Sequence, residues 1–165
     1  MKVIAIHGDF ATGEQLRYDM GDPPWVDHYA TAKTFSQFVA QVPYGDVVLV
    51  GYSRGAEWIR QFANAYGFGA ITRIRGMVGY EPLALGEFVL ARSVPRLLIY
   101  NSRGRGAWTR LGASSIEKWR GPGTTELAGR GFHIRVKMQP PFIGHAWDKS
   151  INPEIQRWLS ELGRK

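Results

Sequence analysis

The sequence of 165 residues contains no cysteine, which excludes disulfides and thiolate-bound metals. Because the absence of disulfides suits a reducing compartment, we expect a cytoplasmic protein. No apolar run approaches the roughly 20 residues that a membrane-spanning helix needs. The first residues, MKVIAIHGD, are too few and become polar too early for a signal peptide, so they are interpreted as the first strand of the fold.

No run of like charges is present either, although the net charge is +7. Much of the excess lies in the second half, at Arg103, Arg105, Arg110, Arg120, Arg130 and Arg135. No recognised nucleic-acid-binding motif accompanies these arginines. We therefore expect a basic, solvated surface and no nucleic-acid partner, with binding of nucleic acid or an anionic surface as an alternative.

Short apolar segments alternate with amphipathic ones, and we expect a single domain over residues 1–165. The patterns predict strands at 3–6, 25–30, 46–52, 74–80, 96–100 and 132–138, and helices at 31–42, 56–67, 83–92 and from Asn152 onward. Asn152 and Pro153 suit the N-cap and N1 positions of the last helix. The expected fold is α/β, a three-layer sandwich with a mostly parallel sheet of about six strands.

The segment 47–56, VVLVGYSRGA, places a serine inside Gly-x-Ser-x-Gly, between the most apolar predicted strand and a predicted helix. A nucleophile elbow has this setting, because its strained strand-to-helix turn lifts a reactive serine above the carboxyl edge of a sheet. Gly51 and Gly55 keep side chains from colliding in the turn. The N–H groups at the start of the helix favour negative charge at the same place. Ser53 is therefore predicted to be a nucleophile.

Four segments resemble the α/β-hydrolase family over nearly the whole chain: HGDF (7–10), GYSRGA (51–56), RLLIY (96–100) and GHAWD (144–148). The resemblance implies a trimmed α/β-hydrolase fold without an obvious lid domain, since two N-terminal strands of larger members have no room before Val3. It also implies an oxyanion hole made by the N–H group of Arg54 and a second one from Asp9 or Phe10. The implied chemistry requires no metal and no cofactor.

His145 is the predicted general base among the four histidines of the chain. It follows the last predicted strand, which matches the chain order serine, acid, histidine. His7 is expected to brace the oxyanion loop instead. Asp148, three residues after His145, is expected to cap or salt-bridge the last helix rather than act as the triad acid.

The triad acid is harder to assign, because the position that the family most often uses reads Asn101-Ser102-Arg103. Glu81 is the predicted acid, since it directly follows the predicted strand 74–80 at the carboxyl edge of the sheet. Asn101, Glu117, Glu126 or a dyad without an acid remain alternatives.

The predicted reaction is acyl transfer to water through an acyl-enzyme on Ser53, by a carboxylesterase-like serine hydrolase. Its substrate is expected to be a small molecule or another acyl ester. Trp108 and Trp147, with Trp25, fall on predicted carboxyl-edge loops and are expected to line a substrate pocket, whereas Trp58 and Trp158 are expected to pack helices. A hydrolase-fold binding module or pseudoenzyme without turnover is the alternative, and the sequence does not indicate an oligomeric state.

Overall fold

The computed structural model of the protein describes residues 1–8, 11–66, 71–80, 96–102, 133–139 and 146–163. Of these, 96–102 and 133–139 are described as backbone. The helix predicted at 83–92 lies outside the described residues.

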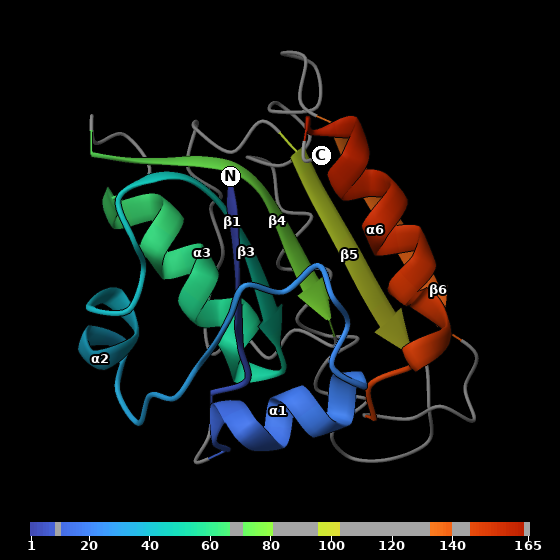
Figure 1. Ribbon diagram of the computed structural model, residues 1–165, viewed down its shortest axis with the longest axis horizontal. Helices are drawn as coiled ribbons and strands as arrows, with labels where there is room; N and C mark the ends of the chain where they lie inside the picture. The colour runs from blue at the N-terminus through green and yellow to red at the C-terminus, as the bar shows by residue number, and fades with distance from the viewer. Residues whose placement is uncertain (9–10, 67–70, 81–95, 103–132, 140–145, 164–165) are drawn as a thin grey trace.

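The strands form one sheet with the order β2-β1-β3-β4-β5-β6, and each pair of neighbours is parallel (Figure 1). They are β1 (Lys2–Ile6), β2 (His28–Ala30), β3 (Gly45–Tyr52), β4 (Thr72–Tyr80), β5 (Arg96–Ser102) and β6 (His133–Gln139). All carboxyl ends therefore point to the same edge of the sheet. The alternating segment that forms β6 lies at one end of this strand order, as its pattern predicts.

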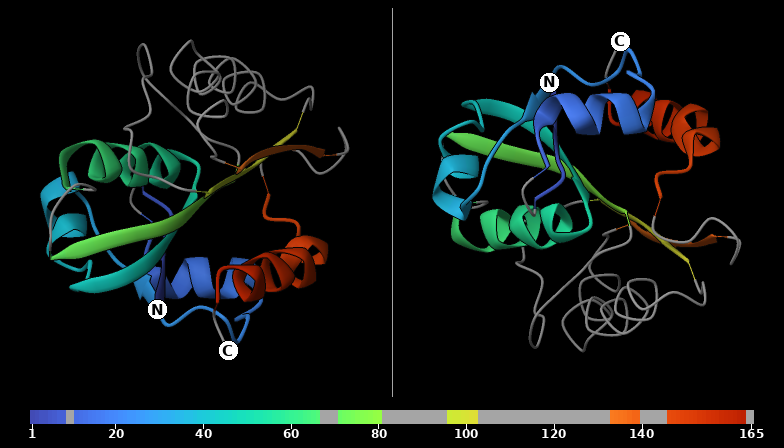
Figure 2. Two further views of the ribbon diagram at one scale, coloured as in Figure 1. Left: turned by 90° about the horizontal axis from the view of Figure 1, so that it is seen from above. Right: turned by 90° about the horizontal axis from the view of Figure 1, so that it is seen from below.

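Helices cover both faces of the sheet (Figure 2). The helices α1 (Gly13–Met20) and α6 (Asn152–Glu161) lie on one face, and α2 (Phe35–Val39) and α3 (Arg54–Tyr66) lie on the other. Alternate residues of β3 belong to two buried apolar clusters. Val47 and Leu49 pack in the cluster that includes α3, whereas Val48 and Val50 pack in the cluster that includes α1 and α6. The predicted three-layer α/β class is confirmed. Among the described residues, no helix combines the length and apolarity needed to cross a membrane.

The first two helices differ from the sequence-based expectation. The patterns predict no helix at α1, because Leu16 and Met20 are its only buried apolar side chains. Its ends are nevertheless marked, since the Thr12 hydroxyl accepts a hydrogen bond from the N–H group of Gln15 and Gly21 follows with a φ of +76°. The helix predicted over 31–42 is shorter, because Thr34 caps α2 by accepting from the N–H group of Gln37.

The predicted N-cap at Asn152 is wrong. A short 3-10 helix, η1 (Lys149–Ile151), precedes α6, and Ile151 occupies the N-cap position. The Asn152 side chain instead accepts from the Trp147 indole N–H group at 3.2 Å and donates to the carbonyl oxygen of Met20 at 2.8 Å. Asp148, expected to cap or salt-bridge the last helix, instead caps the preceding η1 by accepting from the N–H group of Ser150.

Candidate active site

The chain reverses its direction of travel across the sheet between β1 and β3. The connection after β1 runs through α1 to β2, toward one edge of the sheet. The connection after β3 runs through α3 to β4, toward the opposite edge. α1 and α3 lie on opposite faces of the sheet (Figure 2), so the carboxyl ends of β1 and β3 mark its topological switch point. Ligands of open α/β sheets bind at such a switch point. His7 and Gly8 follow β1 there, and Ser53 follows β3.

Ser53 forms the turn between β3 and α3 in a left-handed backbone conformation, with a φ of +56°. Only Asp22 shares a positive φ among the described residues other than glycine. The turn is fixed by the Ser53 N–H group, which donates to the carbonyl oxygen of Tyr80 at 2.9 Å, and by the Ser53 carbonyl oxygen, which accepts from Ala56 at 3.1 Å. Strained conformations of this kind persist where the surrounding structure over-determines them, and they cluster at functional sites.

Two glycines are required by close backbone approach at this turn. A Cβ atom on Gly51 would lie 2.5 Å from the backbone nitrogen of Ala56, and one on Gly55 would lie 2.7 Å from the carbonyl oxygen of His7. The N–H group of Gly55 donates to that same carbonyl oxygen at 2.5 Å. Gly8, with a φ of +79°, in turn lies against Arg54 and Gly55. The end of β1 is therefore pressed directly onto the first turn of α3.

The first turn of α3 begins at Arg54, directly after Ser53. The N–H groups of a first helical turn have no acceptor within the helix and carry the positive end of its dipole. The start of α3 therefore favours negative charge next to Ser53. The role of the Arg54 N–H group as an oxyanion donor stays a prediction.

His7 braces the other side of the turn with its ring as well as its backbone. Its Nδ1 atom donates to the carbonyl oxygen of Gly8 at 2.9 Å, and its ring packs edge-on against Tyr52, with 4.3 Å between the ring centroids. The loop after β1 is thus attached to β3 through Tyr52 and to α3 through Gly55. This agrees with the bracing role expected of His7.

Several predicted site residues lie outside the described residues, namely Asp9, Phe10, Glu81, Trp108, Glu117, Glu126 and His145. Tyr80 and Ala146, the chain neighbours of Glu81 and His145, are described. Tyr80, which precedes Glu81, binds Ser53 through its carbonyl oxygen and donates its hydroxyl to the carbonyl oxygen of Ala146 at 2.7 Å. Ala146 directly follows His145. The chain positions next to the predicted acid and base are therefore joined to each other and to Ser53.

Trp147 is 7% exposed and packs on the rings of Tyr80 and Tyr52, with centroid distances of 4.5 and 6.0 Å. A small cavity of about 220 Å³ adjoins it, lined by Tyr18, Asp19, Tyr52, Ala146, Trp147 and Lys149. Its role in substrate binding stays a prediction.

The remaining described tryptophans belong to the interior. Trp25 precedes β2, at the amino end of that strand, so the expectation that it lies at the carboxyl edge is wrong. It is 4% exposed within the cluster that also contains α1 and α6. Trp58 and Trp158 are buried on α3 and α6, as expected for helix packing.

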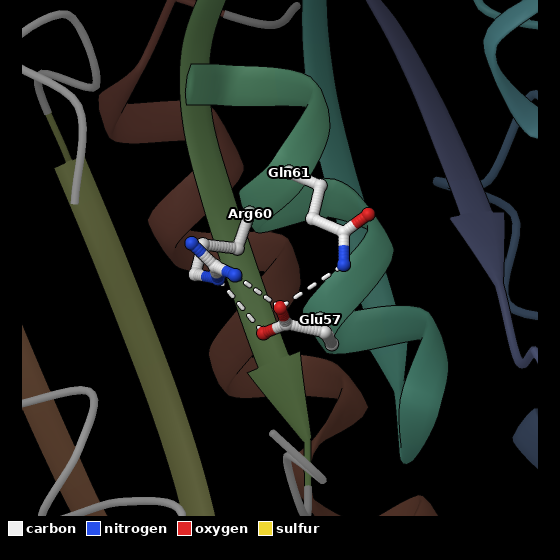
Figure 3. Close-up of polar contacts among 3 residues, drawn as sticks. All are labelled: Glu57, Arg60 and Gln61. Carbon is white, nitrogen blue, oxygen red and sulfur yellow. Dashed lines mark hydrogen bonds and ion pairs between the residues drawn. The ribbon is translucent and has the colours of Figure 1, made fainter. Parts of the chain in front are cut away.

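Glu57, one turn after Ser53, has both carboxylate oxygens engaged within α3 (Figure 3). Arg60 binds one oxygen through Nε at 2.8 Å and the other through a terminal nitrogen, and the Gln61 amide donates to the latter at 3.1 Å. These bonds compensate the burial of the carboxylate, which explains an acidic residue on an otherwise apolar helix face. No three metal-ligating side chains gather anywhere in the described part of the chain.

The fold is similar to solved structures over almost its full length. A carboxylesterase from Bacillus cereus aligns with a TM-score of 0.65 and 12% identity, covering 98% of this chain and 88% of that one. A carboxylesterase from Mesorhizobium loti aligns with a TM-score of 0.61 and 12% identity, covering 96% and 88%. The mouse alpha/beta hydrolase domain-containing protein 10 aligns with a TM-score of 0.51 and 12% identity, covering 98% and 90%.

The chain has the α/β-hydrolase fold. No protein-family model and no curated protein matches the sequence. An α/β-hydrolase fold supports many activities, so the chemistry has to be argued from the residues at its switch point. Here those residues are a strained serine, the start of α3 and a loop braced by His7.

Proposed function

We propose that the protein is a carboxylesterase-like serine hydrolase that cleaves the ester bond of a small molecule or another acyl ester. The observation that carries this proposal is the left-handed conformation of Ser53 at the end of β3, directly before α3. A serine held in this way at the switch point of an α/β-hydrolase fold has the setting of a nucleophile elbow. The carboxylesterases among the similar structures support the same class of reaction.

In the proposed mechanism, the Ser53 oxygen attacks the ester carbonyl carbon while His145 accepts the hydroxyl proton. The carbonyl oxygen becomes negatively charged and is held by the Arg54 N–H group and by a second N–H group from Asp9 or Phe10. Donors placed in advance at such an oxygen contribute about 10²–10³-fold in rate each. His145 then returns the proton to the departing alcohol, and the same steps with water as the nucleophile release the acid.

The contacts of Tyr80 and Ala146 support His145 as the base. Tyr80 at the end of β4 binds Ala146, the residue after His145, at the carboxyl edge where a base for Ser53 is needed. His145 also follows Ser53 in the chain order that this fold uses.

We propose Glu81 as the acid that orients the imidazole and stabilises its charged form. Support comes from Tyr80, the preceding residue, which is hydrogen-bonded both to Ser53 and to Ala146. Asn101, Glu117, Glu126 and a dyad without an acid are the competing assignments. Trp108 and Trp147 are proposed to contact the substrate, and the cytoplasmic location expected from the lack of cysteine stays a prediction.

Turnover of p-nitrophenyl acetate and butyrate by the wild type, Ser53→Ala and Glu81→Gln tests this function. We expect loss of activity in Ser53→Ala and a large loss in Glu81→Gln, because the imidazole then lacks its charged partner. Ser160→Ala, an exposed serine on α6, serves as the matched control and should be fully active. Full activity of Glu81→Gln would overturn the assignment of the acid, whereas full activity of Ser53→Ala would overturn the function.

A hydrolase-fold module that binds without turnover is the second candidate. The sequence feature that favours it is the absence of a carboxylate at Asn101-Ser102-Arg103, where β5 ends. It predicts that the folded wild-type protein hydrolyses neither ester above the rate of Ser53→Ala. Turnover that depends on Ser53 would exclude it.

A further inference from the structure

Tyr80, the last residue of β4, is completely buried and connects two segments that are distant in the sequence. Its carbonyl oxygen accepts from the N–H group of Ser53 at 2.9 Å. Its hydroxyl donates to the carbonyl oxygen of Ala146 at 2.7 Å and accepts from the N–H group of Asp148 at 2.9 Å. One side chain and its own backbone therefore contact both the serine turn and the loop into α6.

The ring of Tyr80 is held from two sides. Trp147 packs on it with a centroid distance of 4.5 Å and an interplanar angle of 33°, and Tyr52 packs edge-on at 5.5 Å. Tyr52 is the direct register partner of Tyr80 in the sheet, and it also packs against the ring of His7. Because rings packed in this way cannot shift independently, the hydroxyl of Tyr80 has a fixed position relative to Ser53.

The hydrogen bonds of the hydroxyl exceed what burial alone requires. A buried tyrosine hydroxyl is satisfied by a single partner, and any nearby backbone group can provide it. Here both bonds go to the one segment 146–148, on either side of Trp147. The two bonds hold the segment 146–148, which begins one residue after His145, in a fixed position and orientation relative to the end of β4.

We infer that Tyr80 is a positioning residue that fixes the distance between the Ser53 oxygen and the imidazole of His145. This inference rests on the proposed function. The hydroxyl of Tyr80 touches peptide groups and takes no proton in the reaction. Its effect is on geometry, and a misplacement of about 1 Å in a reacting group can cost about 10²-fold in rate.

The test is steady-state hydrolysis of p-nitrophenyl butyrate by Tyr80→Phe, which keeps the ring and removes the hydroxyl. We expect kcat to fall about 10- to 100-fold with KM changed less than about threefold, since the pocket walls remain while the proton transfer is misaligned. Hydrogen exchange of the Asp148 amide should become faster in the same variant, because it loses its acceptor. Phe38→Leu, a fully buried ring on the opposite face of the sheet, is the control for lost stability and should keep its kcat while melting earlier.

A wild-type kcat in Tyr80→Phe would overturn the inference and leave the proposed function intact. A fall in kcat that Phe38→Leu reproduces at equal loss of stability would overturn it as well, because destabilisation would then explain the effect. Absence of Ser53-dependent turnover in the wild-type protein would overturn the proposed function, and this inference with it.

Discussion

Replacing Ser53 with glycine should make the protein more stable than replacing it with alanine, although both variants lack the nucleophile. Ser53 has a φ of +56°, a conformation in which a Cβ atom collides with the following carbonyl oxygen. Alanine keeps that Cβ atom and glycine removes it. The comparison between the two variants therefore isolates the backbone strain of the turn from the loss of the hydroxyl.

The size of the effect follows from two opposing terms. A left-handed conformation costs a residue with a Cβ atom about 1–2 kcal/mol. Glycine in turn gives the unfolded chain extra freedom, which costs about 0.4–1 kcal/mol on folding. The difference favours Ser53→Gly by about 0.8 kcal/mol at the centre of these ranges. For a chain of 165 residues, this corresponds to a melting temperature higher by about 2–3 °C.

Thermal unfolding followed by circular dichroism measures this difference. Ser36, an exposed residue of the helix α2, provides the matched control. In a helix glycine is less favourable than alanine, by up to about 1 kcal/mol in the interior, so Ser36→Gly should melt below Ser36→Ala. If Ser53→Gly also melted below Ser53→Ala, the turn would not be strained and the reasoning that makes Ser53 a nucleophile would lose its main support.

Three further predictions concern Gly55, Glu57 and Tyr29. Gly55→Ala should destabilise the protein by about 3 kcal/mol in urea unfolding, because its Cβ atom meets backbone of β1 and of His7. Gly45→Ala, which meets no atom within 4 Å but keeps a φ of +92°, should cost only about 1–2 kcal/mol. Equal costs of the two substitutions would contradict the steric argument. Glu57→Gln should lower the free energy of unfolding by about 1–3 kcal/mol, because Arg60 loses its charged partner. The kcat of the folded enzyme should stay unchanged, and a large fall in kcat would make Glu57 a candidate for the triad acid in place of Glu81. Burial, and then the charge of Asp22, raise the pKa of Tyr29 to about 12. The neutral phenol therefore contributes to the free energy of unfolding fully below pH 10, and this contribution is lost as the pH rises to about 12. Tyr29→Phe should abolish this part of the pH dependence of stability, and an unchanged profile would contradict the prediction.

The central part of the fold is predictable from the sequence, because it depends on local patterns. The uninterrupted apolar run Val47–Val50 belongs to a strand that is buried on both faces. The Gly-x-Ser-x-Gly segment predicts a tight turn at Ser53, and the structure shows that turn with its positive φ. Such signals are contained within a few consecutive residues, so no knowledge of distant contacts is needed.

The parts that the sequence predicts poorly depend on distant contacts. Asn152 has the side chain of an N-cap, yet it donates to the carbonyl oxygen of Met20, which is distant in the sequence. The helix α1 is missed because its apolar face consists of two side chains. The link from Tyr80 to the segment after His145 requires the register of β3 and β4 and the return of a remote loop. Periodicity cannot supply such information.

Covalent labelling by a fluorophosphonate is the most direct test of the claim that Ser53 is a nucleophile. Intact mass and peptide mapping of the wild-type protein should show one adduct per chain, located on Ser53, and none on Ser53→Ala or on heat-unfolded protein. A folded wild-type protein that acquires no adduct, or acquires it on another serine, would contradict the account.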